Sequence, residues 1–464
     1  MPVRNVLFLI LATAGCLAAW IAKERDRRGH RLNEVLSYVE AAYIEPIGGE
    51  PLFGAAVDGI VSRLDENSAF VSGGEQRQLE AALDQQFAGV GLEVELAPEG
   101  GDLTVVAPVV GGPAWRAGIV PGERVVGIDG AATRGMSLDE AVRLLRGPPG
   151  TAVAVRLLPP AAAGTAADAG ASRELRLERE LVGVESVQGD RRRPDGSWDW
   201  WLEDEPGIAL VRINGFGERT VAEFDAALAA VEAAAVAESG GRPRGVVIDL
   251  RGNPGGLLAP AVEICDRLLD EGVIVSTRGR DPDADVRRAT PGAALAGVPL
   301  AVLIDGLTAS SAEIVAACLQ DHGRAVVVGS RSYGKGTVQS ILPLSAGGLL
   351  KITTSEYRRP SGAPIHRRPG DEAAAVWGVV PDAGGEVVPS GRALERLRRW
   401  RRVRDLPLAA DAPPAAVGDE RPRDVDEVLA RGLERLADPS QGRGDLGREE
   451  EAAGHADEAA ARGA

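Results

Sequence analysis

The sequence predicts an α/β (α+β) core with a mixed or mainly parallel sheet, an inserted module made mostly of β-strands, and helices near the N-terminus. Three observations carry this prediction. Apolar runs of strand type alternate with helical patterns from Gly207 onward, which is typical of an α/β layer. Residues 88–182 consist of short strand patterns and turns around one helix, and residues 29–87 show helical spacing. A chain of 464 residues is long enough for two or three such parts.

The first 28 residues contain an apolar segment. Val6 to Ala22 is an uncharged stretch of 17 residues between Arg4 and the charged run 23–28, near the shortest length that can cross a bilayer. We interpret residues 1–28 as a membrane anchor or signal segment, and the apolar residues that continue past the small residues 13–16 favour an uncleaved anchor. Residues 13–16 also fit a lipoprotein cleavage site, so a lipidated or cleaved signal and a buried helix remain alternatives.

Residues 29–87 are interpreted as the N-terminal helical part of the core. Apolar side chains recur there at helical spacing, at Leu32, Val35, Leu36 and Val39. These helices are expected to supply packing and no chemistry.

The mostly β module spans residues 88–182. Its single helix is predicted from Ser137 to Arg146, because serine is a favoured N-cap and the run Gly-Pro-Pro-Gly at 147–150 would end the helix. The low-complexity run from Pro159 to Gly170 is interpreted as a flexible loop between two strands.

Strands and helices alternate in the predicted core, residues 183–390. The strand patterns lie at 208–213, 246–250, 273–277, 300–304 and 325–328, and the helical patterns lie at 221–237, 258–269 and 312–319. Residues 391–464 form an Arg-rich and then acidic tail, which we expect to be partly disordered, although Val425 to Leu436 could form one helix.

Composition excludes some classes of function. The net charge of −16, with no basic run interleaved with aromatic residues, argues against nucleic acid as a partner. The three cysteines and four histidines show no ligand spacing, which argues against a metal site or a metal hydrolase. Cys265 and Cys318 lie in apolar helical patterns and are interpreted as small buried hydrophobes.

Ser310 is the first candidate for chemistry. It follows the strand pattern 300–304 and a short turn, and it stands where the helical pattern 312–319 begins. The free N–H groups and the positive dipole of a helix N-terminus can stabilise an oxyanion on a bound carbonyl. Because Glu313 follows three residues later, Ser310 also fits a capping box, and this purely structural interpretation stays open.

Lys335 is the second candidate. Only three of the 52 lysine and arginine residues are lysine, and Lys335 lies 25 residues after Ser310 in the run Tyr333-Gly334-Lys335-Gly336-Thr337. A desolvated lysine can become a neutral amine and accept a proton from a serine hydroxyl, which arginine cannot do. The helix and strand between the two residues would return the chain to the same edge of the sheet, where ligands bind in open α/β sheets.

The run DLRGNPGG at 249–256 leaves a third strand at the same kind of position. Its paired glycines allow close approach of a substrate and expose N–H donors, so an oxyanion hole is one interpretation. A simple turn after a strand is the other.

A phosphate-binding loop is the competing interpretation of residues 329–335, which have its glycine and lysine spacing. Gly336 lacks the hydroxyl that would hold magnesium, and the sequence after it continues as an apolar stretch instead of clearly opening a helix. We therefore do not favour nucleotide binding.

These residues resemble the carboxyl-terminal processing peptidases, also called tail-specific proteases, a family of Ser-Lys serine endopeptidases with a PDZ domain. The resemblance extends from about residue 30 to residue 385. It rests on several motifs in the order of the family: GFGERT at 215–220, DLRGNPGG at 249–256, TASSAEI at 308–314, GKGTVQ at 334–339, PSG at 360–362 and VPD at 380–382.

The resemblance implies a role for each matched residue. Ser310 would be the nucleophile and Lys335 its general base, with Gln339 positioning the lysine. The oxyanion donors would be the backbone N–H groups of Gly255, Gly256 and Ser311. Asp321 would give possible support, or would be an ordinary acid at a helix end. Ser311-Ala312 stands where alanine and then serine are commoner, and the side chains of these two residues are expected to have no catalytic role.

The β module likewise resembles a PDZ domain. The loop Gly89-Val90-Gly91-Leu92 would receive the terminal carboxylate of a peptide, which would add as a strand beside residues 92–94. The helix from Ser137 would line the groove with Val142 and Leu145. Both residues also fit core positions, and the core interpretation is preferred for Val142.

The sequence therefore predicts a serine endopeptidase that binds unstructured protein C-termini through its PDZ domain and cleaves them with a Ser310–Lys335 dyad, without a metal or organic cofactor. It would be held by its N-terminal segment at the periplasmic or extracytoplasmic face of a bacterial envelope, and it could form a homo-oligomer. The alternative is a catalytically silent scaffold that binds peptides and leaves them uncut.

Overall fold

The computed structural model describes Thr13 and residues 29–72, 85–96, 101–160, 172–239, 241–280, 285–344, 347–368, 370–371, 375–407 and 422–437. The apolar segment Val6 to Ala22, apart from Thr13, and most of the predicted loop 159–170 lie outside the described residues. The chain divides into two compact units. The smaller is Met1–Gln76 with Gln339–Thr353, and the larger is Arg77–Val338 with Thr354–Ala464.

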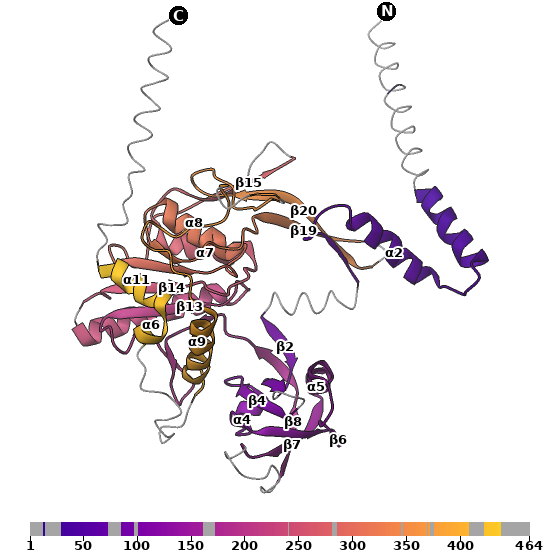
Figure 1. Ribbon diagram of the computed structural model, residues 1–464, viewed down its shortest axis with the longest axis horizontal. Coiled ribbons are helices and arrows are strands. Elements are labelled where there is room, and N and C mark those ends of the chain that lie inside the picture. Colours follow the sequence, from indigo (N-terminus) through magenta and orange to yellow (C-terminus); the bar gives the residue numbers. More distant parts are fainter. Residues whose placement is uncertain are drawn as a thin grey trace, which may run out of the picture. The chain divides into compact units, whose positions relative to one another are not determined.

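A five-stranded sheet forms the centre of the larger unit, in the order β10-β13-β14-β17-β18 (Figure 1). Its strands are β10 (Val187–Gln188), β13 (Ile208–Ile213), β14 (Gly245–Asp249), β17 (Leu300–Ile304) and β18 (Val326–Gly329). β13, β14, β17 and β18 pair in parallel, and β10 is antiparallel to β13. The predicted α/β core with a mixed, mainly parallel sheet is therefore confirmed.

Both faces of this sheet are covered. Helices α6 (Thr220–Ser239), α7 (Leu258–Leu268) and α8 (Ser311–Asp321) pack with the strands in one core, to which Ile248, Val302 and Val327 contribute. Alternate residues of the same strands, such as Val247 and Leu303, belong to a second core with helix α11 (Glu427–Ala437). Cys265 and Cys318 are fully buried in the first core, as predicted. Strands that bury both faces read as continuous apolar runs, which is the pattern seen in the sequence.

The C-terminal segment corrects the prediction of an Arg-rich tail. Residues 391–404 form helix α9 (Gly391–Arg404), and short helix α10 (Pro422–Val425) precedes α11. Arg401 and Arg404 of α9 are buried and both pair with Asp190, which is itself only 1% exposed. The sequence reading missed α9 because charged residues dominate it, and their burial depends on acidic partners that lie far away in the sequence.

The inserted module contains a six-stranded sheet whose main path is β3-β4-β5-β7-β8, with β6 beside β5. Helix α5 (Leu138–Leu145) begins as predicted, because the Ser137 hydroxyl accepts the Glu140 N–H at 3.2 Å and Glu140 reaches back to the Ser137 N–H. A short helix α4 (Pro113–Arg116) was not predicted. The strands are β3 (Leu92–Leu96), β4 (Leu103–Pro108), β5 (Arg124–Ile128), β6 (Ala131–Ala132), β7 (Ala152–Leu158) and β8 (Arg173–Glu178).

Several smaller strands complete the larger unit. β2 (Gln86–Gly89) pairs with β9 (Glu180–Gly183), and β11 (Arg191–Arg192) pairs with β12 (Trp198–Asp199). β15 (Val273–Gly279) lies between β16 (Val286–Arg288) and the end of the long strand β20 (Leu349–Arg358).

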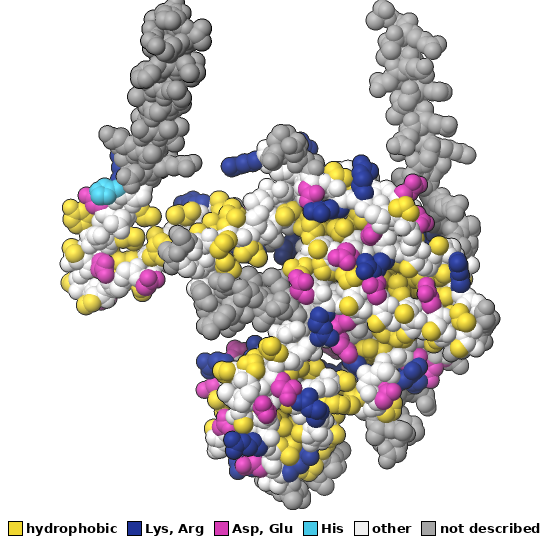
Figure 2. Space-filling model, turned by 180° about the vertical axis from the view of Figure 1, so that it is seen from behind, with side chains coloured by type: hydrophobic (Ala, Val, Ile, Leu, Met, Phe, Trp, Pro, Cys, Tyr) yellow, Lys and Arg dark blue, Asp and Glu magenta, His cyan; other side chains and the backbone are white. Residues whose placement is uncertain are grey.

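The smaller unit has a helix over residues 29–42 and helix α2 (Gly49–Val61). Its strand β1 (Ala69–Val71) pairs with the first part of β20, and β19 (Thr337–Pro343) also pairs with β20. β1 and the start of β2 lie within residues 29–87, which were interpreted as the N-terminal helical part, so this range also contains strands. Many apolar side chains are exposed on this unit, among them Tyr38, Ile44 and Ile60 (Figure 2). Among the described residues, no helix has the length and apolar content needed to cross a bilayer.

Candidate functional site

Four loops leave the carboxyl ends of the parallel strands β13, β14, β17 and β18. Parallel strands end at the same edge of a sheet, so these loops gather on one side of the core. They carry the motifs 215–220, 249–256, 308–314 and 334–339. The sheet topology therefore brings together segments that are far apart in the sequence.

Ser310 stands at the start of α8 in a strained conformation. Its φ is 55° and its ψ is −120°, a region that non-glycine residues rarely adopt. Ser310 and Glu313 stand in the reciprocal arrangement of a capping box at the start of α8. The structural interpretation of Ser310 therefore stays open beside the catalytic one, and the strained backbone is what points to a further role.

Glu313 links the Ser310 loop to the Lys335 loop. Its Oε2 accepts the backbone N–H groups of Ser310 and Lys335, each at 2.8 Å, so the two amide nitrogens lie within twice that distance of each other. Its Oε1 accepts the Gly334 N–H at 2.7 Å and the Ser332 hydroxyl at 2.6 Å. Burial raises the pKa of Glu313, although the four hydrogen bonds act in the opposite direction.

The glycine turn 252–256 lies directly against Ser310. Gly255 has a φ of 96°, and a Cβ there would lie 2.7 Å from the Ser310 Cβ and 3.0 Å from the Ser311 nitrogen. A Cβ at Gly256, whose φ is 146°, would lie 2.1 Å from the carbonyl oxygen of Phe216. Both positions therefore require glycine, as the sequence suggested for a turn that approaches another chain closely.

The two paired glycines differ in their N–H groups. The Gly255 N–H donates to Asn253 Oδ1 at 2.8 Å, so it is already bonded within the turn. Gly256 is held instead through its carbonyl oxygen, which accepts the Ser311 hydroxyl at 2.9 Å. Of the two glycines, Gly256 is thus the better candidate for an N–H donor. The Ser311 hydroxyl, for which no catalytic role is expected, has a structural one, because it ties the glycine turn to the start of α8.

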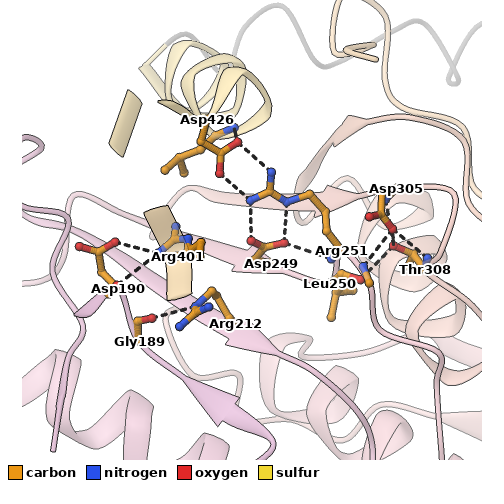
Figure 3. A network of polar contacts seen from close by, with 12 residues as sticks. Gly189, Asp190, Arg212, Asp249, Leu250, Arg251, Asp305, Thr308, Arg401 and Asp426 are labelled. Carbon is orange, nitrogen blue, oxygen red and sulfur yellow. Dashed lines mark hydrogen bonds and ion pairs between the residues drawn. The ribbon is translucent and has the colours of Figure 1, made fainter. Parts of the chain in front are cut away.

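Further bonds join the same two loops. The Gly252 N–H donates to Asp305 Oδ1 at 2.9 Å, the Thr308 hydroxyl donates to the Leu250 carbonyl at 2.9 Å, and the Ala309 N–H donates to the Asn253 carbonyl at 2.9 Å. Figure 3 shows Asp305 and Thr308 beside Leu250. The loops after β14 and β17 therefore form one cross-linked platform around Ser310.

The remaining predicted site residues are Lys335, Gln339 and Asp321. Lys335 is half-buried, and Gly336 packs so closely on His366 that a Cβ would lie 2.3 Å from the His366 nitrogen. Gln339 belongs to the smaller unit, where its Nε2 donates to Thr353 Oγ1 at 3.3 Å. Asp321 lies at the opposite end of α8 from Ser310, where it is partly buried and pairs with Arg359.

In the inserted module, the predicted peptide-binding residues lie on helix α5 and in the loop 89–92. Leu145 is buried in the core of the module and Val142 is half-buried, which reverses the preference for Val142 as a core residue. Gly91 has a φ of 71°, and the loop 89–92 leads into β3, the end strand of its sheet path. An end strand has one edge available for a further strand.

The comparisons with known proteins agree with this architecture. Residues 207–383 match the family model of Peptidase family S41, and residues 104–158 match that of a PDZ domain. The protein is therefore a peptidase with an inserted PDZ domain.

Two relatives define the family more closely. The carboxy-terminal-processing protease of Bartonella bacilliformis is 33% identical over 72% of each chain, and the carboxyl-terminal-processing protease of Synechocystis is 34% identical over 70% of this chain and 69% of the relative. The chain belongs to the carboxyl-terminal processing peptidases of family S41. A solved structure, that of a photosystem II D1 C-terminal processing protease, is 26% identical and covers 82% of this chain and 97% of its own, with a TM-score of 0.44.

Sequence reasoning did not assign a role to Glu313, Arg251 or the Ser311 hydroxyl. Glu313 was visible only as half of a capping box. Its burial was the missing information, because a fully buried carboxylate at a helix start must find several donors. Arg251 was visible in the motif 249–256, but its partner Asp426 lies 175 residues away.

Proposed function

We propose that the protein is a serine endopeptidase that trims protein C-termini with Ser310 as nucleophile and Lys335 as general base. The observation that carries this proposal is the shared carboxylate of Glu313, which binds the backbone N–H groups of both residues at 2.8 Å. The strained backbone of Ser310 supports the same role.

The proposed reaction follows from these positions. The Ser310 Oγ attacks the scissile carbonyl carbon while its proton passes to the neutral amine of Lys335, and the carbonyl electron pair moves onto oxygen. The backbone N–H groups of Gly256 and Ser311 stabilise that oxyanion, since the Ser311 N–H lies in the first turn of α8, where no helical carbonyl can accept it. Lys335 then gives its proton to the leaving amine, and water activated by the same lysine releases the acyl group.

Gln339 would orient Lys335 in this scheme. Gly255 would shape the turn, because its own N–H is bonded to Asn253. Asp321 would support the site from a distance, by fixing the far end of α8 to the turn 359–361 through Arg359 and the Ser361 N–H. No step of this scheme uses a metal or an organic cofactor.

The PDZ domain would supply the substrate. The loop Gly89-Val90-Gly91-Leu92 would bind the terminal carboxylate of an unstructured protein tail, and the tail would add as a strand to β3, with Val142 and Leu145 of α5 on the other side of the groove. The end position of β3 in its sheet path supports this mode of binding.

A groove of about 420 Å³ would accommodate a substrate side chain next to the glycine turn. Leu257 and Leu258, which directly follow Gly256, line it together with residues from the start of α6 and α7. Its lining combines apolar and acidic side chains, among them Val221, Glu218 and Glu263. Such a lining suits a substrate side chain whose aliphatic part packs against the apolar residues of the groove.

The N-terminal segment would place the enzyme at the outer face of a bacterial envelope membrane. The support is the uncharged run Val6 to Ala22, flanked by charged residues on both sides. Substrates would then be proteins with exposed, unstructured C-termini in the same compartment.

The test compares the purified full-length protein with its Ser310→Ala and Lys335→Arg variants on a fluorogenic peptide that ends in a free, apolar C-terminus. Both variants should lose about 10⁴-fold or more in kcat, because arginine keeps the charge but cannot accept the proton. Turnover retained in Lys335→Arg would contradict the dyad. Binding without cleavage by the wild-type protein would instead favour the silent scaffold.

A further inference from the structure

We propose that Asp426, at the start of the C-terminal helix α11, is a positioning residue for catalysis that holds the glycine turn 252–256 through Arg251. The inference rests on the proposed function, in which Gly256 of that turn donates to the oxyanion. In this proposal, the C-terminal helix α11 contributes to catalysis by fixing the position of the glycine turn.

The guanidinium of Arg251 is held between two carboxylates (Figure 3). Its Nε and Nη2 donate to Asp249 at 2.9 and 2.7 Å, and its Nη1 and Nη2 donate to Asp426 at 2.8 and 2.7 Å. Asp249 is 7% exposed and Asp426 is 1% exposed. A planar guanidinium with two bidentate partners has little rotational freedom, so this arrangement fixes where Arg251 lies.

The position of Asp426 is set by α11 and not by the turn. Its Oδ1 also accepts the Leu429 N–H at 3.0 Å, so the same carboxylate caps the helix that it starts. Val428, Leu429 and Leu433 bury that helix in the core that covers one face of the sheet. At Gly432, a Cβ would lie 2.9 Å from Leu303, which indicates how closely the helix packs on β17. The packing of α11 on the sheet therefore fixes the position of the Asp426 carboxylate.

Arg251 connects the Asp426 carboxylate to the glycine turn. Its backbone N–H donates to Asp249 Oδ1 at 3.0 Å, and the next N–H, that of Gly252, donates to Asp305 at 2.9 Å. From there the chain reaches Gly255 and Gly256 within four residues, in backbone conformations that leave no room for a Cβ beside Ser310. A displacement of Arg251 would therefore move the Gly256 N–H relative to Ser310.

Catalysis is more sensitive to such a displacement than binding is. Oxyanion donors act only when they lie at hydrogen-bond distance from the position of the oxyanion, and a misplacement of about 1 Å can cost about 10²-fold in rate. Buried ion pairs, by contrast, often add little to stability compared with apolar packing. The buried cluster is therefore better explained by the geometry that it fixes.

The experiment uses the full-length protein and the fluorogenic tail peptide. Asp426→Asn keeps the shape of the side chain and removes its charge, and Glu427→Gln makes the same chemical change at the next, exposed residue as the matched control. We expect Asp426→Asn to lower kcat by about tenfold or more with KM changed less than about twofold. Glu427→Gln should keep both constants within about twofold.

A second readout separates positioning from general damage. A peptide aldehyde reacts with Ser310 by forming one bond between Oγ and the aldehyde carbon, while the carbonyl electron pair moves onto oxygen and the hydroxyl proton passes to Lys335. The oxyanion so formed needs the same donors as the reaction. Asp426→Asn should weaken aldehyde inhibition in proportion to the loss in kcat, and it should leave the Kd of the uncut tail peptide unchanged in a Ser310→Ala background.

Wild-type kcat in Asp426→Asn would overturn the inference, and so would an equal loss of aldehyde and tail-peptide binding. If Asp426→Asn does not fold, Asp426→Glu takes its place, because it keeps the charge and moves the carboxylate by one methylene. The same split between aldehyde and tail-peptide binding is then required, and wild-type kinetics would refute the proposal. A wild-type protein that cannot cleave, or a Ser310→Ala variant that cleaves equally well, removes the proposed function itself, whatever the result at Asp426.

Discussion

At the scale of single residues, Ser310 has a strained backbone conformation, and hydrogen bonds of Ser310 and Ser311 hold it in place. A non-glycine residue at its φ of 55° and ψ of −120° costs about 1–3 kcal/mol. The Ser310 N–H is bound by Glu313, and the adjacent Ser311 hydroxyl is bound to Gly256. These contacts hold the strained backbone conformation of Ser310.

The first prediction concerns Glu313, whose two oxygens accept four donors. Glu313→Gln replaces one oxygen with an NH₂ group, and in either orientation of the amide at least one backbone N–H then faces a donor. We expect kcat to fall roughly 10- to 100-fold and the free energy of unfolding to fall by about 1–3 kcal/mol. Steady-state kinetics and urea unfolding measure the two effects.

Glu232→Gln, at an exposed position of α6, is the control for this change. A Glu313→Gln enzyme with kcat within about twofold of the wild type would show that the carboxylate does not connect the two loops.

The second prediction concerns the Ser311 hydroxyl. Ser311→Ala removes its 2.9 Å bond to the Gly256 carbonyl and creates almost no cavity. We expect kcat to decrease about 3- to 10-fold with KM nearly unchanged, because one net hydrogen bond in the turn is worth about 0.5–1.5 kcal/mol. Ser276→Ala, a half-buried serine of β15, should have no such effect. Equal kinetics in the two variants would show that the glycine turn needs no tether from Ser311.

At the scale of elements, local patterns predicted those structures whose signals are local. The strand runs and the helices 221–237, 258–269 and 312–319 were predicted nearly to their observed bounds, because apolar periodicity and caps lie within each segment. Helix α9 was missed, because its Arg401 and Arg404 become buried only through pairing with Asp190, and its C-cap Asp405 pairs with Arg212 of β13, which no local pattern reveals. The pairing of β1 with β20 depends on residues about 280 positions apart and was equally invisible.

The third prediction belongs to helix α5 of the PDZ domain. Val142→Asp places a negative charge beside the proposed site for a peptide carboxylate and should weaken tail-peptide binding about tenfold or more. Fluorescence anisotropy in a Ser310→Ala background measures this Kd without cleavage. Arg143→Ala, an exposed neighbour on the same helix, should bind normally. Normal affinity in Val142→Asp would show that the peptide does not lie along α5.

At the scale of the whole molecule, the C-terminal segment completes the fold. Alternate residues of β14, β17 and β18 are apolar on both faces, so the sequence implied a cover for each face. The helices 221–237, 258–269 and 312–319 accounted for one cover. The second is α11, which lies beyond the Arg-rich segment and was predicted only as one helix in a partly disordered tail. Charge composition misled the domain assignment there, because it describes average solvation and cannot show which charges become paired.

The last prediction concerns acid stability and follows from the same attachment. Burial by itself would raise the pKa of Asp426, but the charges of Arg251 and Arg401 and the hydrogen bonds from Arg251 and the Leu429 N–H together outweigh it and hold the pKa below the ordinary value of 3.8. A carboxylate with a lowered folded pKa stabilises the protein above its unfolded pKa, and this contribution is lost as the pH falls through the folded pKa. The difference in unfolding free energy between the wild type and Asp426→Asn should therefore stay constant from pH 7 to about pH 5 and shrink progressively as the pH falls through the unfolded value of 3.8 towards the folded pKa. Urea unfolding at a series of pH values measures it. A difference that shrinks already between pH 7 and pH 5 would mean that Asp426 is protonated too easily to be paired with Arg251 in solution, and the link between α11 and the glycine turn would then be absent.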